Sequence, residues 1–393
     1  MRRVQLSEIT KFIRNGKSIK NSSDGAGLPI TRIETISDGI VNESKLGYGG
    51  VKDISKIRDY WLEDGDILMS HINSPKHLGK TALYRKNDLD IIHGMNLLGI
   101  RPIESKVQPA YLNYYFLSKD FDSFIKSISN QSVNQASFAA SKLKKLKIPL
   151  PCLSEQKAIV AKLDRAQRLI DIDKKMLAKY DELIQSVFLE MFGDPVTNPK
   201  GWEMNKLEDL TTKVGSGSTP RGGSKVYQDH GNIFIRSQNV LMNKMDLSDV
   251  AYISDEIHKG MKNTWVQEND VLLNITGASI GRVCVYNKSE AANVNQHVCI
   301  LRTIQEKIKP FYLSHLISSK NYQDKIIGQQ TGGTRQAFNM TQIKNFDIPL
   351  PPPKEQLRFN EMLTKLKKEI ENMKFDMKKS EELFSSLVQG AFG

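Results

Sequence analysis

Two stretches of the chain repeat apolar residues every three or four positions, the spacing of an amphipathic helix. One series runs from Ile159 to Met191, and the other runs in the same phase from Phe359 to Ala391. This spacing over such a length predicts two long helices that pair as a coiled coil. The predicted seam comprises Ile159, Leu163, Ile170, Leu177, Ile184, Met191, Phe359, Leu363, Ile370, Met377 and Phe384.

The same phrase opens both helical stretches. It is IPLPCLSEQ at residues 148–156 and IPLPPPKEQ at residues 348–356. Proline lacks an amide hydrogen and suits the positions just before a helix, and the glutamate of each phrase places negative charge in the first turn. Both stretches end in Phe-Gly. About 38 residues at roughly 1.5 Å per residue predict a rod of roughly 57 Å.

The blocks that precede each phrase also repeat, more loosely. GDILMS at residues 65–70 corresponds to NDVLLN at residues 269–274, and PAYLNYYFLSKDF at residues 109–121 corresponds to PFYLSHLISSKNY at residues 310–322. Short β-branched runs between Gly, Asn and Asp are typical of strands. We therefore predict an α+β fold with two strand-rich, mixed α/β domains, residues 1–150 and 194–350, and two helical segments, residues 151–193 and 351–393.

Positive charge is concentrated in the strand-rich blocks. The chain has 393 residues and a formal charge of +12, and residues 1–150 carry 23 Lys and Arg against 15 Asp and Glu, a net +8. Residues 201–350 carry 17 against 14, a net +3, whereas the helical stretches are close to neutral. This distribution favours a polyanionic partner that binds the two domains. The sequence has no long apolar run and only three cysteines, so we expect a cytoplasmic protein without a membrane span or a disulfide framework.

Motifs for catalysis are missing from the sequence. HLGKT at residues 77–81 ends like a phosphate-binding loop, but Ser74 stands where that loop needs glycine. No Asn-Pro-Pro-aromatic methyltransferase motif occurs, and no two histidines have the spacing of a metal-binding pair. His297 stays open between a framework residue and a contact with the polyanionic partner.

The whole plan resembles the specificity subunit of type I restriction-modification enzymes. The resemblance is carried by the two phrases with their helices, by GWEMNKLEDL at residues 201–210 and by GSGSTPRGG at residues 215–223. The first block departs from this pattern, because it lacks the Trp-Glu start and has RNGKSIKNSSDG in place of the Gly-Ser-Gly loop.

The resemblance implies two target-recognition domains, each reading half of a bipartite site in double-stranded DNA. It also implies that the helices form an antiparallel coiled coil that relates the halves by a pseudo-two-fold axis and sets their spacing. Two methyltransferase subunits and restriction subunits would be the partners. S-adenosylmethionine, ATP and Mg²⁺ would then bind those partners, with no active site, cofactor or metal on this chain.

Loops rich in cationic, amide and hydroxyl side chains are the candidates for DNA contact. In the first domain they are Arg32, Ser70, His71, Asn73, Lys76, Lys80, Asn130, Gln131, Asn134 and Gln135. In the second they are Ser216, Ser218, Thr219, Arg221, Arg236, Gln238, Asn239, Asn274, Thr276, Gln329, Gln330, Thr331, Arg335 and Gln336. Arg32 and Arg236 hold equivalent positions, and internal ion pairs are an alternative role for both.

Two other functions stay open on the sequence. One is a standalone nucleic-acid-binding scaffold without catalytic partners. The other is a metal-dependent nuclease whose acidic residues converge from separate loops.

Overall fold

The computed structural model describes residues 2–20, 27–37, 39–50, 54–132, 135–328 and 337–393. The chain divides into two compact units, one formed by Met1–Lys174 with Lys374–Gly393 and the other by Lys175–Met373. Each unit contains one strand-rich domain, called domain 1 and domain 2 below, and one end of each long helix.

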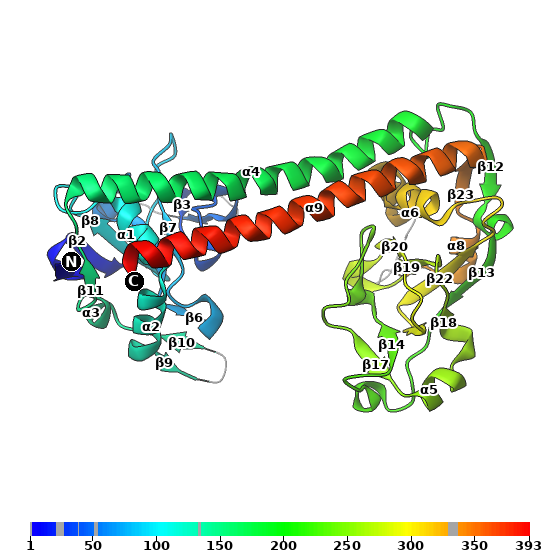
Figure 1. Cartoon of the computed structure of the whole chain (residues 1–393), viewed down its shortest axis with the longest axis horizontal. Helices are drawn as coiled ribbons and strands as arrows, with labels where there is room; N and C mark the ends of the chain where they lie inside the picture. The colour runs from blue at the N-terminus through cyan, green and yellow to red at the C-terminus, as the bar shows by residue number, and fades with distance from the viewer. Residues whose placement is uncertain (1, 21–26, 38, 51–53, 133–134, 329–336) are drawn as a thin grey trace. The chain divides into compact units, whose positions relative to one another are not determined.

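The two long helices are α4, Leu153–Phe192, and α9, Pro353–Phe392. In the first unit, Leu163 near the start of α4 shares a buried core with Val388 and Phe392 at the end of α9. Figure 1 shows these first turns of α4 beside the last turns of α9. In the second unit the ends are reversed, because Phe188 of α4 packs with Phe359 of α9. The pairing within each unit is therefore antiparallel, and the predicted mixed fold with long helices and an internal repeat is confirmed.

Burial along the predicted seam is uneven. Leu163, Ile170, Phe359 and Leu363 are buried. The other seam residues are half-buried: Ile159, Leu177, Ile184, Met191, Ile370, Met377 and Phe384. Residues between the seam positions are largely exposed, as an amphipathic helix requires.

Each domain is built on a four-stranded antiparallel sheet with the same strand order. In domain 1 the order is β2 (Thr10–Asn15), β8 (Leu97–Pro102), β5 (Ile67–Ser70) and β7 (Thr81–Leu83). In domain 2 it is β13 (Thr211–Ser216), β22 (Val298–Thr303), β19 (Val271–Asn274) and β20 (Val283–Val285). The first strand of each sheet has an irregular register at the same place, between Thr10 and Phe12 and between Thr211 and Lys213.

The remaining elements of domain 1 surround this sheet. They are β1 (Arg3–Gln5) paired with β11 (Lys147–Pro149), β3 (Leu28–Ile30) paired with β4 (Gly47–Gly49), β10 (Ala136–Ser137) between β6 (Ile72–Asn73) and β9 (Asn130–Gln131), α1 (Pro109–Tyr115), α2 (Lys119–Ile128) and α3 (Ala140–Leu143).

Domain 2 has a larger second sheet. Its remaining elements are β12 (Glu203–Lys206) paired with β23 (Asp347–Leu350), the sheet β17 (Ala251–Ile253), β14 (Asn232–Ile235), β21 (Ala292–Val294) and β18 (Trp265–Val266), the hairpin β15 (Val240–Leu241) and β16 (Lys244–Met245), α5 (Asp255–Gly260), α6 (Pro310–Ser318), α7 (Lys320–Gly328) and α8 (Met340–Lys344).

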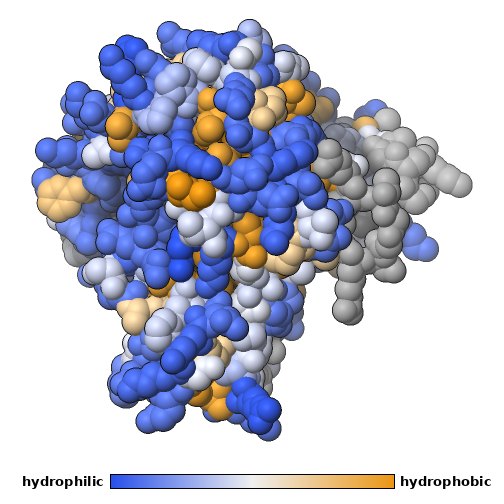
Figure 2. Space-filling model, turned by 90° about the vertical axis from the view of Figure 1, so that its right-hand side faces the viewer, coloured by the Kyte–Doolittle hydropathy of each residue, from blue (hydrophilic) through white to orange (hydrophobic). Residues whose placement is uncertain are grey.

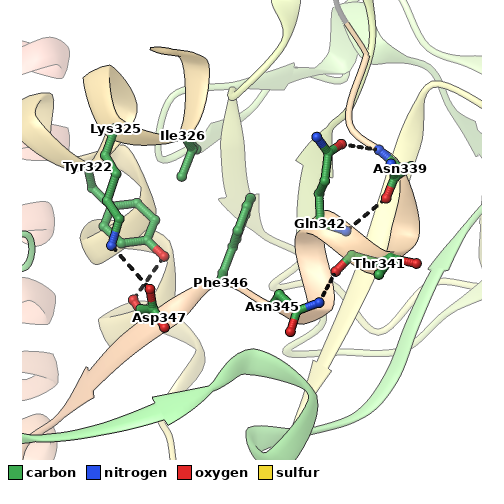
Figure 3. A pocket seen from close by; sticks show the side chains of 9 residues that line it. All are labelled: Tyr322, Lys325, Ile326, Asn339, Thr341, Gln342, Asn345, Phe346 and Asp347. Carbon is green, nitrogen blue, oxygen red and sulfur yellow. Dashed lines mark hydrogen bonds and ion pairs between the residues drawn. The ribbon is translucent and has the colours of Figure 1, made fainter. Parts of the chain in front are cut away.

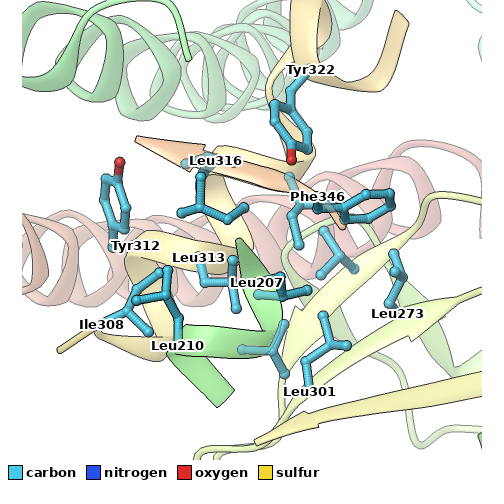
Figure 4. Packing of buried hydrophobic residues seen from close by; sticks show 14 of the residues in the cluster. Leu207, Leu210, Leu273, Leu301, Ile308, Tyr312, Leu313, Leu316, Tyr322 and Phe346 are labelled. Carbon is cyan, nitrogen blue, oxygen red and sulfur yellow. The ribbon is translucent and has the colours of Figure 1, made fainter. Parts of the chain in front are cut away.

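A continuous apolar core joins the main sheet of domain 2 to its helices (Figure 4). Leu207 and Leu210 come from the short 3-10 helix Leu207–Leu210, Leu273 and Leu301 come from the sheet, and Leu313 comes from α6. These side chains are at most 1% exposed. Removal of such side chains from water is the main favourable term in folding.

The repeated phrase closes each domain and fastens the helix that follows. Its Ile-Pro residues form β11 and β23, which pair with the first strand of the same domain. The Tyr111 hydroxyl donates to the Pro149 carbonyl at 2.9 Å, and the Tyr312 hydroxyl donates to the Pro349 carbonyl at 2.5 Å. The phrase is thus both the last strand of a domain and the start of a long helix.

The glutamine of the phrase is fully buried in both copies. Gln156 Oε1 accepts from the Gln108 amide at 2.8 Å, and its Nε2 donates to the Lys106 and Pro151 carbonyls at 3.2 and 3.0 Å. Gln356 makes the same three bonds, accepting from the Lys309 amide and donating to the carbonyls of residues 307 and 351. Because the side chain leaves no polar atom unpaired, its burial is tolerated.

A buried ion pair also recurs at equivalent positions. Arg101 donates through two nitrogens to both Asp66 carboxylate oxygens at 2.8 Å, and Arg302 does the same to Asp270. Both aspartates are nearly inaccessible to water. In domain 1 the guanidinium has a second carboxylate, since Arg101 Nη1 lies 2.5 Å from Glu63 Oε1. This geometry joins an inner strand of each main sheet, β8 or β22, to the turn before β5 or β19.

Domain 1 encloses His71 and His93, and domain 2 encloses His315. Burial lowers the pKa of His93 to about 4 in domain 1 and the pKa of His315 to about 3 in domain 2. His93 Nε2 lies 2.8 Å from the Leu97 carbonyl. His93 and His315 do not correspond, because His93 aligns with Val294 and His315 aligns with Tyr114.

Candidate nucleic-acid interface

Four polar side chains of domain 2 form one hydrogen-bonded row. Thr219 donates to Gln296 Oε1, Gln296 Nε2 lies 3.1 Å from His297 Nε2, and His297 Nδ1 lies 2.6 Å from Thr276 Oγ1. We assign Gln296 as the donor to His297, so that Nδ1 of the ring donates to Thr276. The threonine hydroxyl and the second amide hydrogen of Gln296 then stay available to an external acceptor.

The row gathers three segments that are distant in the sequence. Thr219 belongs to the Gly-rich loop after β13, Gln296 and His297 lie between β21 and β22, and Thr276 follows β19. Thr276 also bridges Ala337, the first described residue after 329–336. The sequence analysis named Thr219 and Thr276, left His297 open and missed Gln296. The one sequence signal for Gln296 is the polar character of the segment NVNQHV at residues 293–298.

The Gly-rich loop lies directly against the backbone of domain 2. A Cβ at Gly217 would stand 1.9 Å from the Val294 carbonyl oxygen, so only glycine fits there. The Ser218 amide donates to the same carbonyl at 3.3 Å. This contact fixes the loop while Ser216, Thr219 and Arg221 stay exposed.

Both predicted arginines are engaged within their own domain. Arg32 Nη1 lies 3.9 Å from Glu34 Oε1, and Arg236 Nη2 lies 3.6 Å from Asp249 Oδ1. Arg236 also donates to the Asp249 carbonyl at 2.8 Å. Both arginine side chains therefore form internal ion pairs, which is the alternative role named in the sequence analysis.

Several predicted contact residues are used inside the fold. Asn274 is fully buried and donates to the Ser237 carbonyl at 2.8 Å, and buried Asn239 donates to the Asp246 carbonyl at 2.9 Å. Ser70 and His71 are buried as well, and burial lowers the pKa of His71. Exposed Gln238 donates to Asp249 Oδ2 at 2.6 Å. We leave these side chains out of the interface proposed below.

Several candidates of domain 1 lie on the small sheet around β10. Ala136 pairs with Asn73 of β6 on one side and with Gln131 of β9 on the other, which brings these two distant residues to one small sheet. The exposed candidates on or beside this sheet are Asn130, Gln131 and Gln135, and Lys76 and Lys80 are exposed in the segment between β6 and β7. Asn134, Gln329, Gln330, Thr331, Arg335 and Gln336 lie outside the described residues.

Domain 2 has a pocket of about 290 Å³ between α7, α8 and β23 (Figure 3). Tyr322 donates to the Asp347 carbonyl, and Lys325 Nζ lies 3.5 Å from Asp347 Oδ2. Lys206 contributes a shorter bond of 2.6 Å, and this bond lowers the pKa of the Asp347 carboxyl. The charged groups of the pocket therefore neutralise one another.

The face drawn in Figure 2 is mostly hydrophilic, with apolar residues scattered singly or in small groups. Within the described ranges, no three His, Cys, Asp or Glu side chains converge in a way that could hold a metal ion. None of the described helices has the length and apolar content needed to cross a membrane.

Comparison with known sequences gives a consistent result over both repeats. The family model described as type I restriction modification DNA specificity domain matches residues 1–179 and again residues 199–379. The chain assigned as the type I restriction enzyme MjaX specificity subunit of Methanocaldococcus jannaschii is 31% identical over 367 residues, which cover 90% of this chain and 83% of that one. The EcoBI specificity subunit of Escherichia coli is 23% identical, covering 90% of this chain and 76% of its own length.

A solved structure has the same fold over nearly the full length. It comes from work on complex assembly and conformational transition of the type I R-M system, and it covers 99% of this chain and 97% of its own with a TM-score of 0.58 and 18% identity. With two matched domains and a relative above 30% identity, the chain belongs to the family of DNA specificity subunits of type I restriction-modification enzymes.

Proposed function

We propose that domain 1 and domain 2 each read one half of a bipartite site in double-stranded DNA. The chain would supply recognition, while two methyltransferase subunits and the restriction subunits would supply adenine methylation and cleavage. S-adenosylmethionine, ATP and Mg²⁺ would be bound by those partners.

The observation that carries this proposal is a duplicated framework with two different polar faces. The main sheets, the Asp-Arg pairs and the phrase glutamines match, whereas the row from Thr219 to Thr276 is repeated only in part, with Ser18 and Asn96 of domain 1 at the positions of Thr219 and His297. There Met95 and Ile72 occupy the positions of Gln296 and Thr276. Two such faces on one scaffold suit two different DNA sequences, because base edges are recognised by side chains of the surface.

We further propose that residues 151–193 and 351–393 act as a spacer between the half-sites and as the docking region for the methyltransferase subunits. Inserting seven residues, about two helical turns, after Lys174 and the same length after Lys374 would lengthen both helices together. We expect the unspecified spacer of the DNA site to change while both half-sites persist. A changed half-site in this variant would argue against a spacer role.

The direct test is to map methylated adenines in DNA from cells that express the chain with its methyltransferase. A bipartite motif is expected, and exchange of residues 1–150 for another recognition domain should change one half only. Metal-dependent cutting by the purified chain alone would instead support a nuclease, and sequence-specific binding without methylation would support a standalone scaffold.

A finer test addresses the polar row. Gln296→Ala should relax or weaken recognition of one half-site, because it removes the link between Thr219 and His297. Gln305→Ala, the same change at an exposed residue after β22, is the matched control. Equal methylation patterns in both variants would exclude Gln296 from the readout.

A further inference from the structure

Four lysines occur within six residues at the end of domain 1. Lys142, Lys144, Lys145 and Lys147, called the lysine patch below, are all exposed. They alternate with Leu143, Leu146 and Ile148, which are buried. The apolar residues anchor the segment in the core, and this anchoring turns the four ammonium groups to solvent.

The backbone of this segment is held in place. The Leu6 amide donates to the Leu146 carbonyl at 2.8 Å, and the Ser7 amide donates to the Lys144 carbonyl at 3.2 Å. Lys147 lies in β11, where it pairs in register with Gln5 of β1. The patch is therefore a feature of a fixed surface.

Domain 2 keeps the anchors and drops the charge. Ile343, Phe346 and Ile348 repeat the buried residues exactly 200 positions later, but the four lysine positions hold Gln342, Lys344, Asn345 and Asp347. In domain 1, Gln5 lies opposite Lys147 on the paired strands, whereas in domain 2 the equivalent residues are Lys206 and Asp347. Lys206 and Asp347 form an ion pair of 2.6 Å. Domain 2 thus neutralises at this place a charge that domain 1 leaves exposed.

Nearby carboxylates do not compensate the lysine patch. Asp120 pairs with Arg3 at 3.0 Å, and Glu8 accepts from the Gln5 amide at 2.9 Å. Among the described residues, the one hydrogen bond from a patch side chain is Lys142 Nζ to the Ile128 carbonyl at 3.1 Å. Four like charges without counter-charges repel one another, and an external polyanion would relieve that repulsion.

From this juxtaposition we infer that the lysine patch binds backbone phosphates of duplex DNA beside the half-site read by domain 1. The inference rests on the proposed function. The bond from Lys142 to Ile128 ties the patch to the segment leading into β9, where Asn130 and Gln131 lie. Exposed lysines act as point charges for phosphate and carry no base information, so the patch adds affinity without sequence preference.

The test compares two pairs of substitutions in the full chain assembled with its methyltransferase subunits. K144Q with K147Q removes two patch charges, whereas K86Q with K288Q removes two exposed charges from the turns after β7 and β20. Affinity for a duplex with the mapped site, and for one with both half-sites scrambled, is measured between about 50 and about 200 mM salt.

Each lysine that contacts a phosphate contributes about −0.9 to the slope of log affinity against log salt, so K144Q with K147Q should make the slope less negative by about 1.8 on both duplexes. The control pair should leave it nearly unchanged. An unaltered slope with intact site-specific binding, or loss of subunit assembly in place of a slope change, would overturn the inference while sparing the proposed function. Absence of site-specific binding by the unaltered assembly would instead overturn the proposed function.

Discussion

Domain 1 and domain 2 share a buried framework and differ most where side chains point outward. The main sheets have one strand order, and Asp66 with Arg101 repeats as Asp270 with Arg302. Around this framework, domain 2 builds a four-stranded second sheet. In the described part of domain 1, the same place holds the two-stranded pair β3 and β4 with single bridges from Ile92 to Ile30 and to Trp61.

This difference shows which parts of a recognition domain are constrained. Inward residues are limited by packing and by the need to pair buried polar groups, so the duplicate copies keep many of them, with exceptions such as His93 in place of Val294. Outward residues carry no such limit and are free to match different ligands. The two copies within one chain therefore act as a comparison that separates framework from interface.

The largest test of this comparison removes a buried carboxylate. Asp270→Ala leaves Arg302 without its partner and should destabilise the protein by about 3 to 5 kcal/mol. Asp66→Ala should cost about 1 kcal/mol less, because Arg101 still has the carboxylate of Glu63 as an ion-pair partner. In domain 2 the position of Glu63 is occupied by the uncharged Gln267. Denaturant unfolding measures both.

The difference between the two sites has its own control. The substitution Glu63→Gln gives domain 1 the glutamine that domain 2 has at Gln267. In that background, Asp66→Ala should destabilise the protein as much as Asp270→Ala does. Unequal losses in that background would mean that another contact distinguishes the ion pairs.

The phrase glutamines should be equivalent. Gln156→Leu and Gln356→Leu each leave one amide and two carbonyls without the side-chain partner, and we expect each to cost about 2 kcal/mol. Thermal unfolding of the two variants should give similar shifts, with the exposed position Gln305→Leu as reference. A loss confined to one variant would break the equivalence of the two copies.

The smallest expected effect depends on pH. His93 is neutral in the folded state, with a pKa of about 4, and the unfolded chain binds a proton below about pH 6.5. Stability is therefore unaffected above that pH and falls as the pH drops from about 6.5 towards 4. At about pH 5.5 the loss from this residue is about 1.4 kcal/mol.

The variant His93→Gln can keep the hydrogen bond to the Leu97 carbonyl without titrating. Its unfolding midpoint should change less between about pH 7 and about pH 5.5 than that of the unaltered chain. The acid sensitivity that persists in this variant should include a contribution from His315, because burial lowers its pKa as well. An identical pH dependence in both proteins would show that His93 does not contribute.

The sequence predicted the repeat well because its strongest pattern is local. Apolar spacing located both long helices, and the proline phrase located their starts. The strand pairing between Val4 and Ile148 was not predictable from the pattern, because it joins the two ends of a domain. Short strands such as β6 and β9 also depend on long-range pairing.

The candidate site was predicted less well for a related reason. Polar residues beside strands include both ligands and framework groups, and sequence alone does not separate them. Asn274 and Asn239 proved to hydrogen-bond the backbone in the interior, whereas Gln296 was missed. A polar side chain is used inside the fold when neighbouring main-chain groups need a hydrogen-bond partner, and only the folded structure reveals that need.

The phrase glutamines have a further consequence for how such chains diversify. Gln156 and Gln356 grip only main-chain atoms of the preceding domain, namely one amide and one carbonyl, together with the carbonyl of their own phrase. These hydrogen bonds therefore do not depend on the side chains of the domain. The apolar contacts of the helices do depend on them, since Leu163 packs in the core of domain 1 and Phe188 stacks on Tyr312, so a foreign domain joined at the phrase would keep the glutamine bonds but would also have to supply a matching apolar face.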